Sequence, residues 1–179
     1  NAHNYVLTEP YGSVYVPPDE ISYDNVERIF DGRLSYFKGS LIIHMIRYEL
    51  QDDDIFFEVL QNFQQEFSDS TATGLDFMYV LNETSGMDFT EFFNQWYFGE
   101  GYPIYNITWV QENDNLQIIS VQTSSMPQVT SLFKMHMPYK IFFNDGTDTT
   151  VNLLQEFNDM EYNLPFEIKL HFARAYINE

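Results

Sequence analysis

Residues 88–109, DFTEFFNQWYFGEGYPIYNITW, contain the point at which the pattern of the chain changes. Before Gly101 the apolar residues recur at i, i+3, i+4, i+7 and i+8, which is helical spacing: Phe89, Phe92, Phe93, Trp96 and Tyr97. Asp88 is placed to be the N-cap of this helix. After Pro103 the period becomes two, and β-branched and aromatic residues alternate as they do in strands. The sequence therefore predicts an α+β chain, helical over residues 1–102 and β-rich over residues 103–179.

Two further helices are predicted upstream of this point. One begins near Asp52–Asp54, whose acidic side chains suit a helix N-terminus, and its apolar face comprises Ile55, Phe56, Val59, Leu60, Phe63 and Phe67. A shorter helix follows, capped by Ser70 or by a residue within 71–73, and Gly86 ends it. Residues 1–20 contain Pro10, Pro17 and Pro18 and are predicted to be loop and extended chain.

The β-rich part is predicted to form a small antiparallel β-sandwich. Besides the strand after Pro103, strands are expected over residues 116–121, 133–143, 149–154 and 166–172. Turn-forming residues occupy 112–115 and 144–147, and the second group includes the hairpin-type pair Asp145-Gly146.

The composition excludes several classes of protein. A hydrophobic fraction of 44% excludes a disordered chain, and a formal net charge of -19 argues against nucleic acid and anionic membrane surfaces as partners. The longest apolar run, residues 41–46, is interrupted by His44 and is too short to insert into a membrane. The chain has no cysteine, and hence no disulfide framework. The acidic balance and the lack of cysteine lean towards an extracytoplasmic bacterial protein without assigning the compartment.

The histidines do not form a recognisable metal site. His3, His44, His136 and His171 are far apart in the sequence, and none has the one-turn spacing of an HExxH zinc helix. We expect His44 to lie on a helix and pack in the protein core, and His136 and His171 to lie on strands. No metal ligand is assigned in this chain.

Tyr36 directly precedes a helical pattern, where a tyrosine is ordinarily a packing or capping residue. Its neighbours change this interpretation. Five short motifs follow one another along the chain: Tyr36-Phe37-Lys38-Gly39, His44-Met45-Ile46-Arg47, Ser85-Gly86-Met87-Asp88, Phe92-Phe93-Asn94-Gln95-Trp96 and Gly101-Tyr102-Pro103. Together they resemble the "Y-x-K-G…h-M-L-R" and "s-G-x-D…F-F-x-Q-W…G-y-P" segments of the gluzincin zinc metallopeptidases of the aminopeptidase N type.

The resemblance implies a helical C-terminal part of a catalytic domain over residues 1–102 and a β-sandwich domain over residues 103–179. It also implies a parent protein that uses zinc to hydrolyse the N-terminal bond of a peptide substrate. The family's HExxH segment is not in this chain, so the chain alone is expected to bind no zinc and to be inactive. The resemblance assigns Tyr36 as catalytic, its phenol donating to the carbonyl oxyanion, whereas Lys38 and Gly39 are expected to serve the turn into the helix, the glycine allowing close backbone approach.

One position departs from the family pattern, because Gln51 stands where the family has the glycine of Leu-Gly-Asp; this alters a helix C-cap and no catalytic group. Two other interpretations stay open. The parent could be a catalytically silent scaffold of the same fold, which the presence or absence of HExxH in it would decide. Alternatively, the chain could be a β-sandwich adhesion or carbohydrate-binding module, which predicts that Trp109, Tyr139 or Phe142 forms an exposed aromatic patch.

Overall fold

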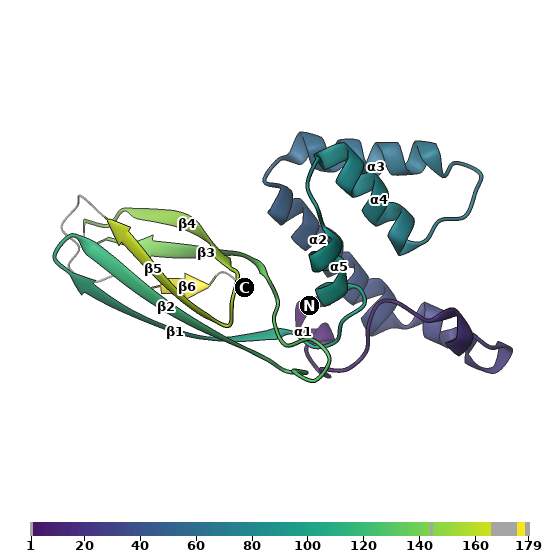
Figure 1. The fold of residues 1–179 in the computed structure, drawn as a ribbon, viewed down its shortest axis with the longest axis horizontal. Coiled ribbons are helices and arrows are strands. Elements are labelled where there is room, and N and C mark those ends of the chain that lie inside the picture. Colours follow the sequence, from purple (N-terminus) through teal and green to yellow (C-terminus); the bar gives the residue numbers. More distant parts are fainter. Residues whose placement is uncertain (1, 144, 166–174, 178–179) are drawn as a thin grey trace. The chain divides into compact units, whose positions relative to one another are not determined.

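The computed structural model describes residues 2–143, 145–165 and 175–177 (Figure 1). It divides the chain into two compact units. The first runs to Tyr102 and includes Gln128–Thr130, and the second comprises Pro103–Pro127 and the chain from Ser131 onward. The first unit is helical and the second contains antiparallel sheets, which confirms the α+β class.

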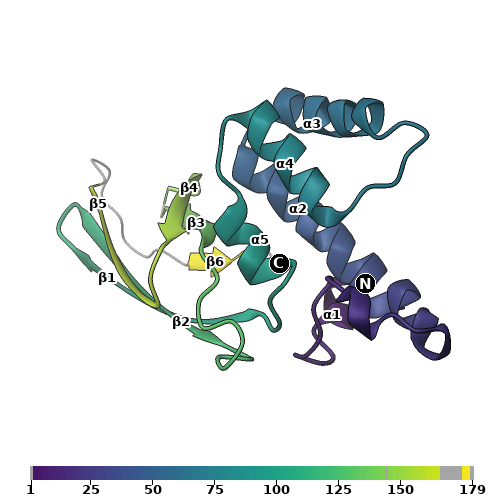
Figure 2. The same cartoon turned by 45° about the vertical axis from the view of Figure 1, so that its right-hand side comes forward.

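The helical unit contains α1 (Ala2–Val6), α2 (Gly39–Leu50), α3 (Asp53–Glu66), α4 (Gly74–Ser85) and α5 (Thr90–Trp96). Short 3-10 segments at Pro18–Glu20 and Tyr23–Phe30 precede a π-helical segment, Gly32–Lys38, which we call the π-turn. α3 and α4 lie side by side in both ribbon views (Figures 1 and 2). The expectation of loop for residues 1–20 was therefore partly wrong, because α1 and the first 3-10 segment are too short to show an apolar period.

The helix ends are set by the side chains that the sequence indicates. The Asp52 carboxylate accepts from the backbone N–H groups of Asp54 and Ile55 at the start of α3. Thr73 and Asp76 form a reciprocal capping box at the start of α4, and Gly86 ends that helix with φ +70°. For α5 the N-cap is Phe89 rather than Asp88, although the Asp88 carboxylate still accepts from the N–H of Thr90.

The core of the helical unit is aliphatic and aromatic. Ile42, Ile46 and Leu50 recur every four residues on α2 and are buried. His44 is exposed, so the expectation that it packs in the core was wrong. The reason is geometric: two residues correspond to about 200° of rotation on a helix of 3.6 residues per turn, which places His44 opposite Ile42 and Ile46. α5 buries Phe92, Phe93 and Trp96, as its period predicts.

The second unit contains two three-stranded antiparallel sheets, in the strand orders β1-β2-β5 and β4-β3-β6 (Figure 2). The strands are β1 (Pro103–Glu112), β2 (Asn115–Ser124), β3 (Met135–Phe142), β4 (Asp148–Gln155), β5 (Asp159–Pro165) and β6 (Ala175–Ile177). The sheets pack face to face through Leu116 and Ile118 of β2 and Met137, Tyr139 and Ile141 of β3. This is the antiparallel sandwich that the period of two predicts.

Two strands, β5 and the short β6, were not among the strands expected from the sequence. β5 was not predicted, because Asp159–Pro165 has a half-buried polar pattern and little β-branched content. It pairs with β2 in the register Gln117↔Asn163 and Ile119↔Glu161. The strand expected over residues 166–172, with His171, lies outside the residues that the structure describes.

Candidate active-site turn

The π-turn is a local departure from α-helical geometry immediately before α2. At its start the Asp31 carboxylate accepts from the N–H of Leu34 at 2.6 Å, and the N–H of Tyr36 donates to the carbonyl of Asp31, five residues earlier. At its end the N–H of Gly39 donates to the carbonyl of Leu34, again five residues earlier. Such π-helical insertions occur mostly as single turns and often at functional sites. The turn carries Tyr36.

Tyr36 lies on the solvent-facing side of this turn, with 59% of its surface exposed. The adjacent Phe37 packs edge-to-face against Tyr5 of α1, with ring centroids 5.4 Å apart. Among the residues that the structure describes, none forms a hydrogen bond with the Tyr36 hydroxyl. The Tyr36 ring therefore does not pack in the core formed by the described residues.

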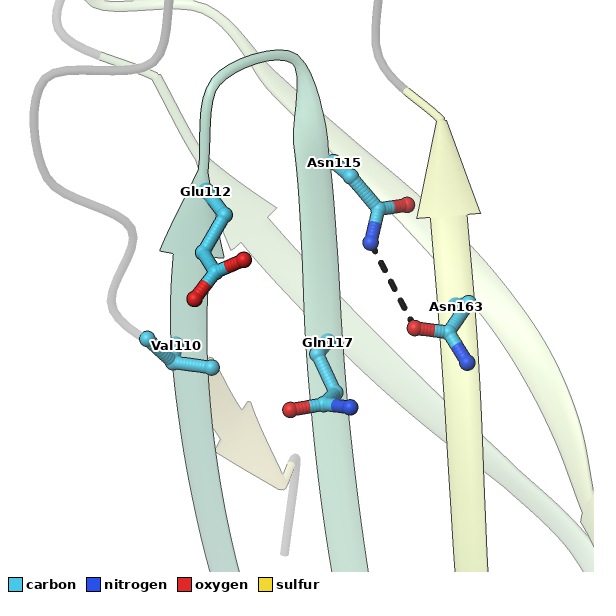
Figure 3. A pocket seen from close by; sticks show the side chains of 5 residues that line it. All are labelled: Val110, Glu112, Asn115, Gln117 and Asn163. Carbon is cyan, nitrogen blue, oxygen red and sulfur yellow. Dashed lines mark hydrogen bonds between the residues drawn. The ribbon is translucent and has the colours of Figure 1, made fainter.

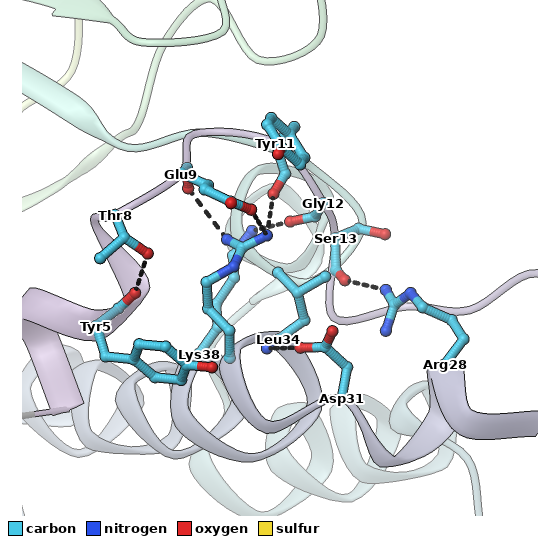
Figure 4. Close-up of polar contacts among 11 residues, drawn as sticks. Tyr5, Thr8, Glu9, Tyr11, Gly12, Ser13, Arg28, Asp31, Leu34 and Lys38 are labelled. Carbon is cyan, nitrogen blue, oxygen red and sulfur yellow. Dashed lines mark hydrogen bonds and ion pairs between the residues drawn. The ribbon is translucent and has the colours of Figure 1, made fainter.

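The opposite side of the turn is buried and cationic (Figure 4). Arg33 donates to the carbonyls of Glu9 and Tyr11 and pairs with the Glu9 carboxylate at 3.5 Å. Just before the turn, Arg28 donates to the carbonyl of Ser13 at 2.6 Å. Three cations, Arg28, Arg33 and Lys38, thus hold the backbone of residues 9–13.

Lys38 is the most enclosed of these cations. Its Nζ donates to the carbonyls of Gly12 and Gly99, each at 3.0 Å, and the residue is only 6% exposed. Burial lowers the pKa of Lys38 to about 8, with Glu100 opposing the change and the charges of Arg33 and Arg28 adding to it. The ammonium therefore links the π-turn to two distant stretches of chain.

These contacts correct the sequence-based roles of Lys38 and Gly39. Lys38 does more than serve the turn into α2, because it binds residues 26 and 61 positions away. A Cβ on Gly39 would meet its nearest atom at 3.9 Å, so no close approach requires a glycine there. The signal that could have identified the cationic side is the spacing of five between Arg33 and Lys38, which places both on one face only if the segment is π-helical.

The described residues do not fit a zinc site. Within residues 2–143, 145–165 and 175–177, no three His, Cys, Asp or Glu side chains gather closely enough to hold a metal ion. Zinc in proteins normally has at least three such ligands. The zinc that the resemblance implies therefore has no cradle in this part of the chain. In the same described part, no helix is both long and apolar enough to cross a membrane.

A second candidate site is a shallow depression of about 220 Å³ on the sheet formed by β1, β2 and β5 (Figure 3). Val110, Glu112, Asn115, Gln117 and Asn163 line it, and Asn115 donates to Asn163 at 3.4 Å. Its side chains are mostly amides that bond across neighbouring strands, as Gln117 does to Glu161 at 2.8 Å. Cross-strand pairs of this kind stabilise a solvated sheet face. Glu112 is the one titratable side chain among the five lining residues, and no second titratable group accompanies it there.

The exposed aromatic patch required by the adhesion-module interpretation is not formed. Tyr139 is fully buried between the sheets, where burial raises the pKa of its phenol. Phe142 is half-buried beneath the ammonium of Lys140, 5.0 Å from the ring centroid. Trp109 is 38% exposed and pairs in register with the buried Ile118. The three rings therefore do not provide a common platform.

Comparison with known proteins supports the family that the motifs resemble. Residues 15–96 match the peptidase family M1 domain, a segment that contains the π-turn and ends with α5. Over 105 residues the chain is 31% identical to aminopeptidase N of Lactococcus lactis subsp. lactis, which covers 58% of this chain. It is 34% identical over 101 residues, 56% of this chain, to probable aminopeptidase 2 of Sulfurisphaera tokodaii. The chain spans 12% of the length of each of these relatives.

The fold has a counterpart among solved structures. Aminopeptidase A of Legionella pneumophila, solved in complex with aspartic acid, superposes on 90% of this chain with a TM-score of 0.73. The sequences are 14% identical, and the match covers 18% of the Legionella chain, so it establishes the fold. The helical unit and the sandwich thus occur together in a much longer protein. Residues 15–96 thus match the peptidase family M1 domain, and together these findings support a partial M1 chain that is similar to part of a gluzincin of the aminopeptidase N type.

Proposed function

We propose that this chain is the part of a zinc-dependent aminopeptidase that supplies the tyrosine facing the scissile carbonyl, and that the intact protein removes N-terminal residues from peptides. The observation that carries the proposal is Tyr36, which lies in the M1 segment and presents an exposed hydroxyl without a protein partner in the part of the chain that the structure describes. The division at residues 102 and 103 would then separate the end of the catalytic domain from a sandwich domain.

Tyr36 would act as a hydrogen-bond donor. When water adds to a peptide carbonyl, the oxygen becomes negatively charged, and a donor fixed opposite it lowers the energy of the transition state more than that of the substrate. A phenol suits this role because its O–H group can donate a hydrogen bond to the developing oxyanion. The metal and the group that activates water would be contributed by residues other than those described here.

Replacing Tyr36 by Phe in the full-length protein tests the assignment. Because the lost donor acts chiefly in the transition state, we expect kcat to fall by about 10²–10³-fold, with KM changed by no more than about twofold. Tyr79→Phe is the matched control, since Tyr79 is an equally exposed tyrosine on α4. A Tyr36→Phe enzyme with unchanged kcat would exclude the residue from the mechanism.

The need for the rest of the protein is tested separately. We expect the 179-residue chain to show no peptidase activity with added zinc, and the full-length protein to contain tightly bound zinc and to release N-terminal residues. Turnover by the purified chain would contradict the first expectation. A full-length protein that is folded but binds no zinc would instead support a catalytically silent scaffold.

A further inference from the structure

The two sides of the π-turn differ in a way that bears on how Tyr36 is held. Tyr36 is exposed on one side, whereas Arg33, Leu34 and Lys38 are buried on the other. The start of the turn is fixed locally by the Asp31 carboxylate on the N–H of Leu34. Its end is fixed from outside the turn, by the Lys38 ammonium between the carbonyls of Gly12 and Gly99.

Both carbonyls belong to backbone that has little room to move. Gly12 adopts φ +97°, and a Cβ on it would overlap the side chain of Leu34 within the turn itself. A Cβ on Gly99 would collide with the carbonyl oxygen of Gln95 and with the hydroxyl of Thr130. The same hydroxyl accepts from the N–H of Glu100 at 3.1 Å. Lys38 therefore bonds to two close-packed points rather than to mobile loops.

We propose that Lys38 is the positioning residue for Tyr36: its ammonium sets the rotation of the π-turn, and hence the direction of the phenol two residues earlier. This inference rests on the proposed function of Tyr36. Without the ammonium, the end of the turn would lose its hydrogen bonds to both carbonyls and keep only the ring contact of Phe37 with Tyr5, so it could relax towards ordinary α-helical geometry. Because Tyr36 and Lys38 share the turn, that relaxation would displace the hydroxyl, and a displacement of about 1 Å can reduce a rate by about 10²-fold.

A double-mutant cycle in the full-length protein separates positioning from general stabilisation. We expect Lys38→Met to lower kcat by about 10-fold with KM within about twofold, and Tyr36→Phe to lower it by about 10²–10³-fold. If Lys38 acts through the Tyr36 hydroxyl, adding Lys38→Met to Tyr36→Phe should lower kcat by less than about twofold more. Independent effects would multiply, and that result would overturn the inference while leaving the role of Tyr36 intact. A silent Tyr36→Phe would overturn the proposed function instead.

Amide hydrogen exchange on the 179-residue chain supplies a readout that does not depend on activity. Lys38→Met should accelerate exchange of the Tyr36 and Gly39 amides by about 10-fold or more, because their hydrogen bonds across the π-turn open more often. Unchanged exchange would contradict the clamp. Lys140→Met, which removes a lysine paired with Asp148 in the sandwich, is the control. It should change neither kcat of the full-length protein nor the exchange of the Tyr36 and Gly39 amides.

If Lys38→Met proves unable to fold, the same cycle is run with Lys38→Arg. This variant keeps the charge, but its planar fork cannot reproduce the geometry of an ammonium between two carbonyls. A loss of kcat that disappears in the Tyr36→Phe background would support positioning. A loss that persists there in full would contradict it.

Discussion

The buried ammonium of Lys38 makes a testable prediction about stability against pH. Burial lowers the pKa of Lys38 to about 8 from its ordinary value of 10.5. Between these two values the unfolded chain holds a proton that the folded chain has released. Since the state that binds more protons is disfavoured as pH rises, unfolding becomes harder across this window, and the contribution of Lys38 to stability increases with pH.

The size of the effect follows from the two pKa values. For a group that titrates near 8 when folded and near 10.5 when unfolded, the gain over neutral pH is about 1.4 kcal/mol at pH 9 and about 2.5 kcal/mol at pH 10. Methionine is similar in length to lysine but has no titratable group. The Lys38→Met variant should therefore lack this gain, although losing the hydrogen bonds to the carbonyls of Gly12 and Gly99 lowers its stability at every pH.

Urea unfolding followed by circular dichroism at the helix band measures this quantity, because the helices that the structure describes all belong to one compact unit and the sheets contribute little at that band. For each protein, the change in unfolding free energy from pH 7 to pH 10 is measured. The change for wild type minus the change for Lys38→Met gives the contribution of Lys38. Groups common to both proteins, such as the tyrosines, cancel in it. Lys140→Met, in the other unit, should follow the wild type. Parallel curves for wild type and Lys38→Met would refute the argument that the ammonium is desolvated.

Two further predictions concern individual residues. Gln51 ends α2 in the left-handed region of backbone conformation, with φ 52°. Gln51→Gly should therefore relieve about 0.5–1 kcal/mol of backbone strain and raise the melting temperature of the helical unit. An unchanged or lower melting temperature would contradict this. Gln122 is 1% exposed, and its side-chain amide donates to the carbonyl of Phe133 and accepts from the N–H of the same residue. Gln122→Leu should therefore destabilise the sandwich by about 2–4 kcal/mol, measured by urea unfolding followed by tryptophan fluorescence. A loss below about 1 kcal/mol would show that these backbone groups find other partners.

Local patterns predicted the helix ends and most strands well, because the deciding residues act on their immediate neighbours. Asp52, Thr73 and Gly86 each control a helix end within three or four residues, so their identity was sufficient. Gln51 occupies the C-cap position that its departure from the family pattern indicates. β5 was missed because its residues depend on pairing with β2 rather than on their own propensity.

The candidate site was only partly accessible from sequence. Tyr36 could be singled out by the motifs around it, but its exposure and the π-turn beneath it depend on hydrogen bonds that span five residues. Lys38 was taken as a turn residue because its partners, Gly12 and Gly99, are distant in the chain. The error at His44 was of another kind. The whole apolar run was assigned to the core, although residues two positions apart on a helix lie on nearly opposite sides of it.

The attachment of Lys38 to Gly99 also constrains the order of folding. The two residues are 61 positions apart, so their contact closes a loop that contains α2, α3, α4 and α5. Contacts of such long sequence separation form after the local ones, because closing the loop costs entropy that nearby contacts do not. During synthesis, a nascent chain can form α2 and α3 before residue 99 has left the ribosome, yet the turn that carries Tyr36 is completed only afterwards. The catalytic candidate would thus be among the last features of the helical unit to take its final form.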